Sequence, residues 1–332
     1  MRRLCLIALC VWMCSCTQNA PTASSTEVDK TRAPWPRLKT IIIADLTQPD
    51  QRPVDLEAEE DKALRHALSA PGRFHSALSS DAGACAVEVR TFYGLLVNGE
   101  LKVEAPQGKA KLVMEAEAHC PTQGKSAGEI ETYRATLDKE THFSEVDGDP
   151  STGGIARLRA LLKESSEEIA ETLFGQVSVR HASDDKVIAA LAAESPAGVL
   201  MEAAGEAGER KLKGAVSHLV RHTRHPEPVV SLRAGAALGL IGHDQPGVIT
   251  ALAEMTEGPD HERHLIAVHA MGDIGGERAA RYLDALAVGH PKAVLREAAR
   301  QAAKRAKALS MKADTEDRSR HDAPPGKGEE GQ

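Results

Sequence analysis

The stretches Leu232-Arg-Ala-Gly-Ala-Ala-Leu-Gly-Leu-Ile-Gly242 and Leu265-Ile-Ala-Val-His-Ala-Met-Gly-Asp-Ile-Gly275 decide the fold, because they repeat one pattern of apolar and small residues. Two weaker copies begin at Leu200 and Leu295, so the four leading leucines are separated by 32, 33 and 30 positions. Self-similarity at a period of this size indicates stacked repeats. Paired helices cannot bury their apolar faces alone, so neighbouring units must share one core.

A second helical segment accompanies each copy. These segments are 213–219, 248–252 and 279–283, and a half unit at 187–191 fits the same slot. A proline follows each of them, at Pro196, Pro226, Pro259 and Pro291. Since proline interrupts helices, the pattern predicts helix pairs with short breaks, and we expect an all-α solenoid over residues 184–310.

The two strongest copies resemble short HEAT repeats of the PBS-lyase HEAT-like type. Leu238-Gly-Leu-Ile-Gly242 and Met271-Gly-Asp-Ile-Gly275 carry the resemblance, which follows the "aLG.iGd" turn of that family. It is strong in the middle two units and degraded at both ends, as capping repeats would be. The resemblance implies a scaffold or binding surface for a protein partner.

Residues 35–180 have a different pattern, which predicts an α+β domain. We expect strands at 38–45, 85–97, 109–119 and 130–143, and helices at 56–69 and 154–174. In the last strand Tyr133, Ala135 and Leu137 alternate with polar neighbours, as in a strand with one solvated face. The order β-α-β-β-β-α favours a mostly antiparallel sheet with helices covering one face.

The first sixteen residues predict an export signal. Met1-Arg-Arg is followed by about a dozen apolar residues, too few to span a bilayer as a stable helix. Met13-Cys-Ser-Cys16 resembles the lipobox of bacterial lipoproteins, although Met13 stands where Leu is usual. The resemblance implies a lipid on Cys16. The alternative is an ordinary signal peptide cut near Ala20 or Ala23.

The residue after Cys16 bears on localisation. It is Thr17 rather than Asp, which by resemblance to Gram-negative sorting implies the outer membrane, with the protein facing the periplasm. Three acyl chains, at about 0.8 kcal/mol per buried methylene, would make release from the membrane negligible. Residues 17–34 are small, polar and contain proline, which predicts a flexible tether.

Two cysteines remain after the signal region and the lipid site, namely Cys85 and Cys120. Two thiols in an oxidising envelope predict one disulfide, with two buried free thiols as the alternative. The pair would meet if segments 85–97 and 109–119 run antiparallel. Closing a loop of about 35 residues should stabilise the fold by roughly 3–4 kcal/mol.

Composition narrows the class of function. The formal net charge of −7 argues against a nucleic-acid partner. Aromatic residues make up 3%, which favours closely packed helices with small side chains over a ligand cage lined with rings. Residues 311–332 are charged, rich in Pro and Gly, and poor in apolar residues, so they predict a disordered tail.

Histidines are the candidates for metal chemistry. His218, His222 and His225 stand at i, i+4 and i+7, so they share one helical face that could hold zinc. Arg221 and Arg224 would oppose a bound cation, which favours the alternative of a polar outer face. We therefore assign no metal, keeping these three histidines as weak candidates.

A second cluster comprises His261, His264 and His269 beside Glu262. The di-iron deoxyhypusine hydroxylases, HEAT-like enzymes, carry His-Glu pairs several residues before the "LG". In this chain the same places hold Leu232-Arg233 and Leu265-Ile266, so the ligands that such an enzyme needs are absent. Loops for phosphate binding, serine-nucleophile elbows and zinc-protease motifs are also lacking. We assign no catalytic residue and no cofactor.

These observations predict a membrane-anchored envelope lipoprotein that serves as a protein-binding adaptor or scaffold through its repeats. Its partner is an unidentified envelope protein. One alternative is an envelope metal-binding protein or enzyme that uses the histidine clusters at 218–225 and 261–269. A further alternative is that the repeats only pack on the 35–180 domain, which would then carry the function.

Overall fold

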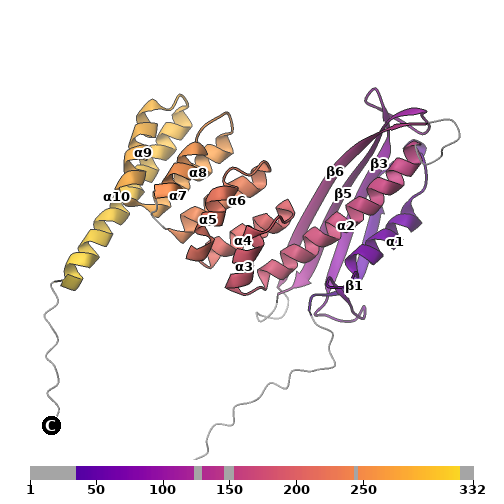
Figure 1. Ribbon diagram of the computed structural model, residues 1–332, viewed down its shortest axis with the longest axis horizontal. Helices are drawn as coiled ribbons and strands as arrows, with labels where there is room; N and C mark the ends of the chain where they lie inside the picture. Colours follow the sequence, from indigo (N-terminus) through magenta and orange to yellow (C-terminus); the bar gives the residue numbers. More distant parts are fainter. Residues whose placement is uncertain (1–34, 123–128, 146–152, 243–245, 322–332) are drawn as a thin grey trace, which may run out of the picture. The chain divides into compact units, whose positions relative to one another are not determined.

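The computed structural model describes residues 35–122, 129–145, 153–242 and 246–321. It contains a mixed sheet with two covering helices, followed by a helical region (Figure 1). The expected signal peptide 1–16 with Cys16, the tether 17–34 and residues 322–332 lie outside the described residues. In the described part, no helix combines the length and the apolar character needed to cross a bilayer.

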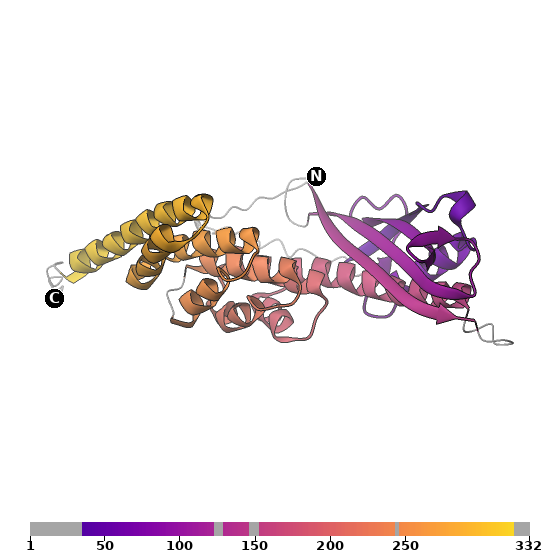
Figure 2. The same cartoon turned by 90° about the horizontal axis from the view of Figure 1, so that it is seen from above.

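The first part of the chain forms six strands. They are β1 (Arg37–Asp45), β2 (His75–Ser76), β3 (Cys85–Val97), β4 (Glu100–Lys102), β5 (Gln107–Pro121) and β6 (Ile130–Ser144). The sheet order is β2-β1-β3-β5-β6, and β4 pairs with β3. Figure 2 shows the long strands β5 and β6 side by side. The long strands lie close to the segments that the sequence predicts.

The sheet is mostly antiparallel, as expected: β3 pairs antiparallel with β4 and β5, and β5 with β6, while β1 is the exception. Strand β1 runs parallel to both β2 and β3, with Ile41 opposite Val87 and Ile43 opposite Val89. A short 3₁₀ helix η1 (Pro49–Gln51) and helix α1 (Glu57–Leu68) lie between β1 and the next strands. This helical crossover returns the chain to its starting edge, which parallel pairing requires.

Helices α1 and α2 (Gly154–Arg180) cover one face of the sheet. Side chains that point toward them are buried: Val87, Val89, Tyr93, Leu112, Met114, Ala116 and Tyr133. The opposite face carries cross-strand ion pairs, such as Lys111–Asp138 at 3.0 Å and Arg134–Glu117 at 2.8 Å. The sheet therefore has one apolar and one solvated face, as the alternation in its sequence predicts.

The expected disulfide joins Cys85 to Cys120. Ala86 faces His119 in the antiparallel ladder of β3 and β5, so the next pair outward places the two cysteines opposite each other. Both residues are fully buried. The prediction from strand pairing is confirmed.

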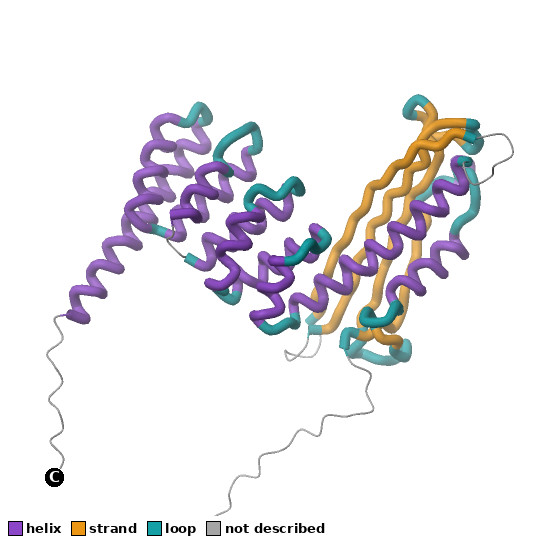
Figure 3. Tube along the Cα trace, in the orientation of Figure 1, coloured by secondary structure: helices purple, strands orange, loops and turns teal. Residues whose placement is uncertain are grey.

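From residue 154 onward the described chain contains helices and no strand (Figure 3). After α2 come α3 (Asp184–Ala192), α4 (Ala197–Glu209), the 3₁₀ helix η3 (Lys213–Ala215), α5 (Val216–His222), α6 (Pro228–Ile241), α7 (Pro246–Glu254), α8 (His261–Ile274), α9 (Gly276–Gly289) and α10 (Ala293–His321). Helices α2, α4, α6, α8 and α10 each pack on the next of this series, which we call the first layer. Helices α3, α5, α7 and α9 form a second layer by the same criterion.

One contact recurs through the first layer. A glycine at the twelfth position of one helix lies against an alanine at the tenth position of the next. A Cβ atom placed on the glycine would lie 2.9 Å from the alanine Cα for Gly208 and Ala237, 2.8 Å for Gly239 and Ala270, and 3.1 Å for Gly272 and Ala302. The helices therefore approach closely at equivalent places.

Two helix ends differ from the sequence-based expectation. Helix α2 continues to Arg180 rather than ending at 174, and it thus belongs both to the sheet's cover and to the first layer. Helix α10 continues to His321, so residues 311–321 are helical rather than part of a disordered tail. Good helix formers dominate 311–320, and the first prolines beyond 310 are Pro324 and Pro325.

Candidate functional site

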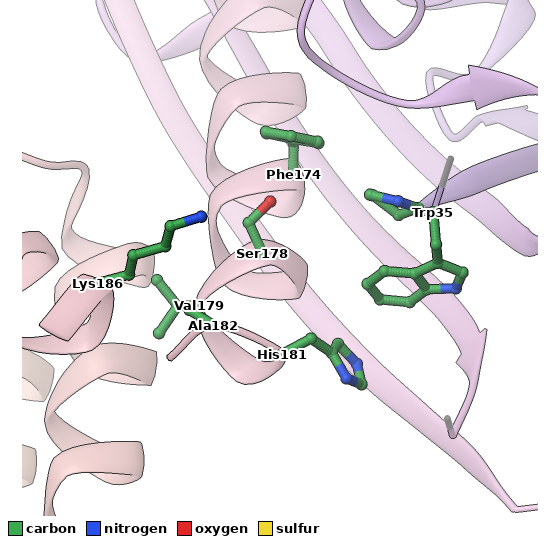
Figure 4. A pocket seen from close by; sticks show the side chains of 8 residues that line it. Trp35, Phe174, Ser178, Val179, His181, Ala182 and Lys186 are labelled. Carbon is green, nitrogen blue, oxygen red and sulfur yellow. The ribbon is translucent and has the colours of Figure 1, made fainter. Parts of the chain in front are cut away.

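A pocket with a volume of about 490 Å³ opens beside the last turns of α2 (Figure 4). It is lined by Trp35, Pro36, Phe174, Ser178, Val179, His181, Ala182 and Lys186. Apolar and aromatic side chains make up most of the wall, and Ser178 and Lys186 add a hydroxyl and an ammonium group. The low aromatic content favoured the absence of a ring-lined site, yet two of the few rings gather here.

Trp35 packs against a histidine just beyond the end of α2. Its ring stands edge-on to the His181 ring, with centroids 4.3 Å apart. His181 Nε2 in turn lies 3.3 Å from Glu131 Oε2. Burial lowers the pKa of His181, against the opposing effect of the Glu131 carboxylate. Aromatic pairs of this geometry contribute about 0.5–1.5 kcal/mol.

An ion-pair cluster around Arg180, the residue before His181, joins α2 to α4. The Arg180 guanidinium bonds the buried Glu206 carboxylate and lies 3.2 Å from Glu209. Burial acts to lower the pKa of Arg180, but the surrounding carboxylates raise it above its usual value. Arg210 Nη2 lies 2.6 Å from the same Glu206 carboxylate. Because a buried carboxylate is costly unless paired, this cluster fixes the contact of the two helices.

The first layer presents a row of exposed or half-buried side chains at equivalent helix positions. We call this row the first-layer face: at position six Glu202, Arg233 and Ile266, and at position thirteen Glu209, Leu240 and Asp273. Burial raises the pKa of Glu202, while Arg180 acts to lower it. Leu240 is 53% exposed, so this face presents one large apolar side chain among charged ones.

The first histidine group takes part in local hydrogen bonds. The buried His222 places Nε2 2.8 Å from the Leu191 carbonyl oxygen, and burial lowers its pKa. His225 accepts a hydrogen bond at Nδ1 from the Glu227 N–H, at 3.1 Å. His218 lies half-buried on the same helix, α5. These contacts join successive helices and loops. The expectation of a polar outer face does not fit His222, which is buried, and His225 lies beyond the last residue of α5.

The second histidine group divides in the structure. His264 is 3% exposed, and its ring lies between those of His261 and His290, with centroid distances of 6.2 and 5.6 Å. His269 lies apart from them and faces Arg305, at 3.2 Å. Over the described ranges, no three His, Cys, Asp or Glu side chains stand where they could hold one metal ion.

The sequence reasoning missed the pocket, because its residues come from two distant segments. One feature of the sequence could have pointed to it, namely Trp35, which lies between Pro34 and Pro36. It is one of two tryptophans in the chain, and the other, Trp12, lies in the expected signal peptide. Lys186 and Phe174 carry no motif. Cys16, the expected lipid site, lies outside the described residues.

No family model and no curated protein matches the chain. Solved structures with similarity include the rare lipoprotein B from Shewanella oneidensis. It has 11% sequence identity and a TM-score of 0.24, and the match covers 41% of this chain and 90% of that protein. A TM-score of this size does not indicate a shared fold.

Proposed function

We propose that the protein is an envelope lipoprotein that binds a partner protein through the first-layer face. In this proposal residues 184–310 form a HEAT-like solenoid, and the lipid on Cys16 holds the protein at the outer membrane, facing the periplasm. The role is binding, without catalysis and without a cofactor. The recurring Gly–Ala contact in three successive helix pairs is the observation that carries the proposal.

The recurring contact supports a binding role through its geometry. Because each pair approaches at the same helix positions, the residue after each glycine comes to the surface at a regular interval. Glu209, Leu240 and Asp273 are these residues. Stacked helices with regularly spaced exposed side chains provide the extended surface on which repeat proteins bind partners.

The test compares the two layers by cross-linking in cells. A photoreactive amino acid is placed at Leu240 on the first-layer face, and a matched control is placed at Val288 on α9, which is 85% exposed. We expect a specific adduct with one envelope protein from position 240 and none from 288. Equal adducts from both positions, or adducts from neither, would contradict the proposal.

Anchoring has a separate test. We expect Cys16→Ser to move the protein from the membrane fraction to the soluble periplasmic fraction, because no acyl chain can then be attached. Mass spectrometry of the membrane-extracted N-terminus should find acyl chains on Cys16 of the unaltered protein. A Cys16→Ser protein that stays membrane-bound although its first fifteen residues have been removed would show that the lipid is not the anchor.

A further inference from the structure

We propose that the pocket beside α2 binds the C-terminal end of a partner polypeptide, with its terminal carboxylate at Lys186 and Ser178 and an apolar last side chain against Trp35 and Phe174. This proposal rests on the proposed function, since it takes the partner to be a protein. It adds a recognition site that lies outside the first-layer face.

The apolar part of the pocket matches one side chain. Trp35 lies on one side of the pocket, and Phe174 lies on α2 (Figure 4), while Pro36 also lines it. Val179 and Ala182 complete the apolar lining. A branched aliphatic side chain between two rings removes apolar surface from water on both sides, which is the main source of affinity in such sites.

The polar part of the pocket matches a carboxylate. Figure 4 shows the Lys186 ammonium extending from α3 toward α2, where the Ser178 hydroxyl points away from it, toward the side on which Phe174 and Trp35 lie. Among the described residues, no acidic side chain pairs with Lys186, and its neighbour Asp184 lies 3.3 Å from Arg210 instead. A carboxylate accepts hydrogen bonds at both oxygens, so one group could satisfy both donors.

The openness of the pocket favours a chain end over a free small acid. A volume of about 490 Å³ accommodates one terminal residue and part of the next, and the pocket is open to solvent, so the rest of a polypeptide could leave it. Capture of a terminal carboxylate is an established mode of peptide recognition. One lysine also balances the single negative charge of a chain terminus.

Trp35 provides the readout for the test. The chain without residues 1–16 retains Trp35 as its one tryptophan, so indole emission reports this pocket alone. The probe is the acetylated pentapeptide Ser-Ala-Ser-Ala-Leu with a free carboxylate. Comparison probes are the same peptide as a C-terminal amide, a version ending in Ser, and octanoate.

We expect a saturable change in Trp35 emission with the free-acid peptide, and binding at least about tenfold weaker for the amide and for the version ending in Ser. Lys186→Ala should weaken free-acid binding by a similar factor. The matched control Lys163→Ala, on α2 but outside the pocket, should leave it unchanged. Circular dichroism verifies that both variants fold.

Equal binding of the amide, or unchanged binding by Lys186→Ala, would overturn the proposal. Octanoate binding as tight as that of the peptide would also overturn it, because the site would then take fatty acids. The two proposals can fail separately. If the unaltered protein forms the adduct from position 240 but does not bind the free-acid peptide, the proposed function stands and this inference alone is removed.

Discussion

The sheet domain and the helical region bury their cores with different side chains. Tyr93, Leu112, Met114 and Leu158 fill the space between the sheet and its two helices. The first layer of the helical region instead relies on glycine and alanine, which bring the helix backbones close together. The sheet domain should therefore be sensitive to removed atoms, and the first layer should be sensitive to added ones.

The largest expected effect concerns the disulfide. Replacing Cys85 and Cys120 together by Ala should lower the free energy of unfolding by about 3–4 kcal/mol, because the loop they close gains freedom in the unfolded chain. Denaturant titration measures the loss. If the helical region unfolds in a separate transition, that transition should keep its midpoint. A shift shared by both regions would mean that they unfold as one unit.

The next effect concerns Glu60, which is fully buried in the sheet domain. Burial raises its pKa from 4.5 to about 7, against the hydrogen bond that Thr91 donates. The folded state therefore binds more protons than the unfolded state between pH 4.5 and 7, so this contribution to stability is present at low pH and is lost as the pH rises through 7. Glu60→Gln should gain about 3 kcal/mol relative to the unaltered protein across that range. Urea titrations at pH 4.5 and 8 measure it, and a constant difference would contradict the assignment.

The third effect tests the close contact in the first layer. Gly239→Ala adds one methyl group 2.8 Å from the Cα of Ala270. Since backbone atoms cannot move aside as a flexible side chain can, we expect a loss of about 1–3 kcal/mol despite the better helix propensity of alanine. Thermal and denaturant unfolding measure it. A stabilised Gly239→Ala protein would disprove the packing argument.

The smallest expected effect is that of Gly247→Ala, which serves as the control for Gly239→Ala. Gly247 in α7 has nothing within 4 Å of an added Cβ atom, and it lies in the second layer. Gly247→Ala should stabilise by less than about 1 kcal/mol, because it only reduces the freedom of the unfolded chain. The free energy of unfolding should therefore fall for Gly239→Ala and rise for Gly247→Ala. This difference would show that Gly239 is needed for close helix packing and that Gly247 is not.

The helical segments were predictable because the sequence repeats. The leading leucines make the repeat visible, but they do not mark equivalent positions in the helices. The leading leucines are not equivalent: Leu200 and Leu295 are buried, whereas Leu232 and Leu265 are only partly buried. The glycines mark equivalent positions better, since close backbone approach admits no other residue, while a leucine can be accommodated one or two positions away.

In the sheet domain the strands were predictable and the direction of β1 was not. Alternation of apolar and polar residues defines the faces of a strand, and it carries no information on which way the strand runs. The disulfide was predictable because two cysteines left few choices. The pocket was not, because Trp35 and Lys186 come together only through the packing of the chain's first described residues on α2.

Helix α2 has no break at the point where one region becomes the other. Its last two turns carry Gln176, whose amide donates a hydrogen bond to the Arg134 carbonyl on β6, and Gly175, which lies against Val199 of α4. A fragment starting at Asp184 would leave Val199 and its neighbours facing water. No residue therefore marks a point at which the helical region could be cut from the sheet domain without exposing apolar side chains. Recombination that transferred the helical region without the sheet domain would remove α2, against which α4 packs.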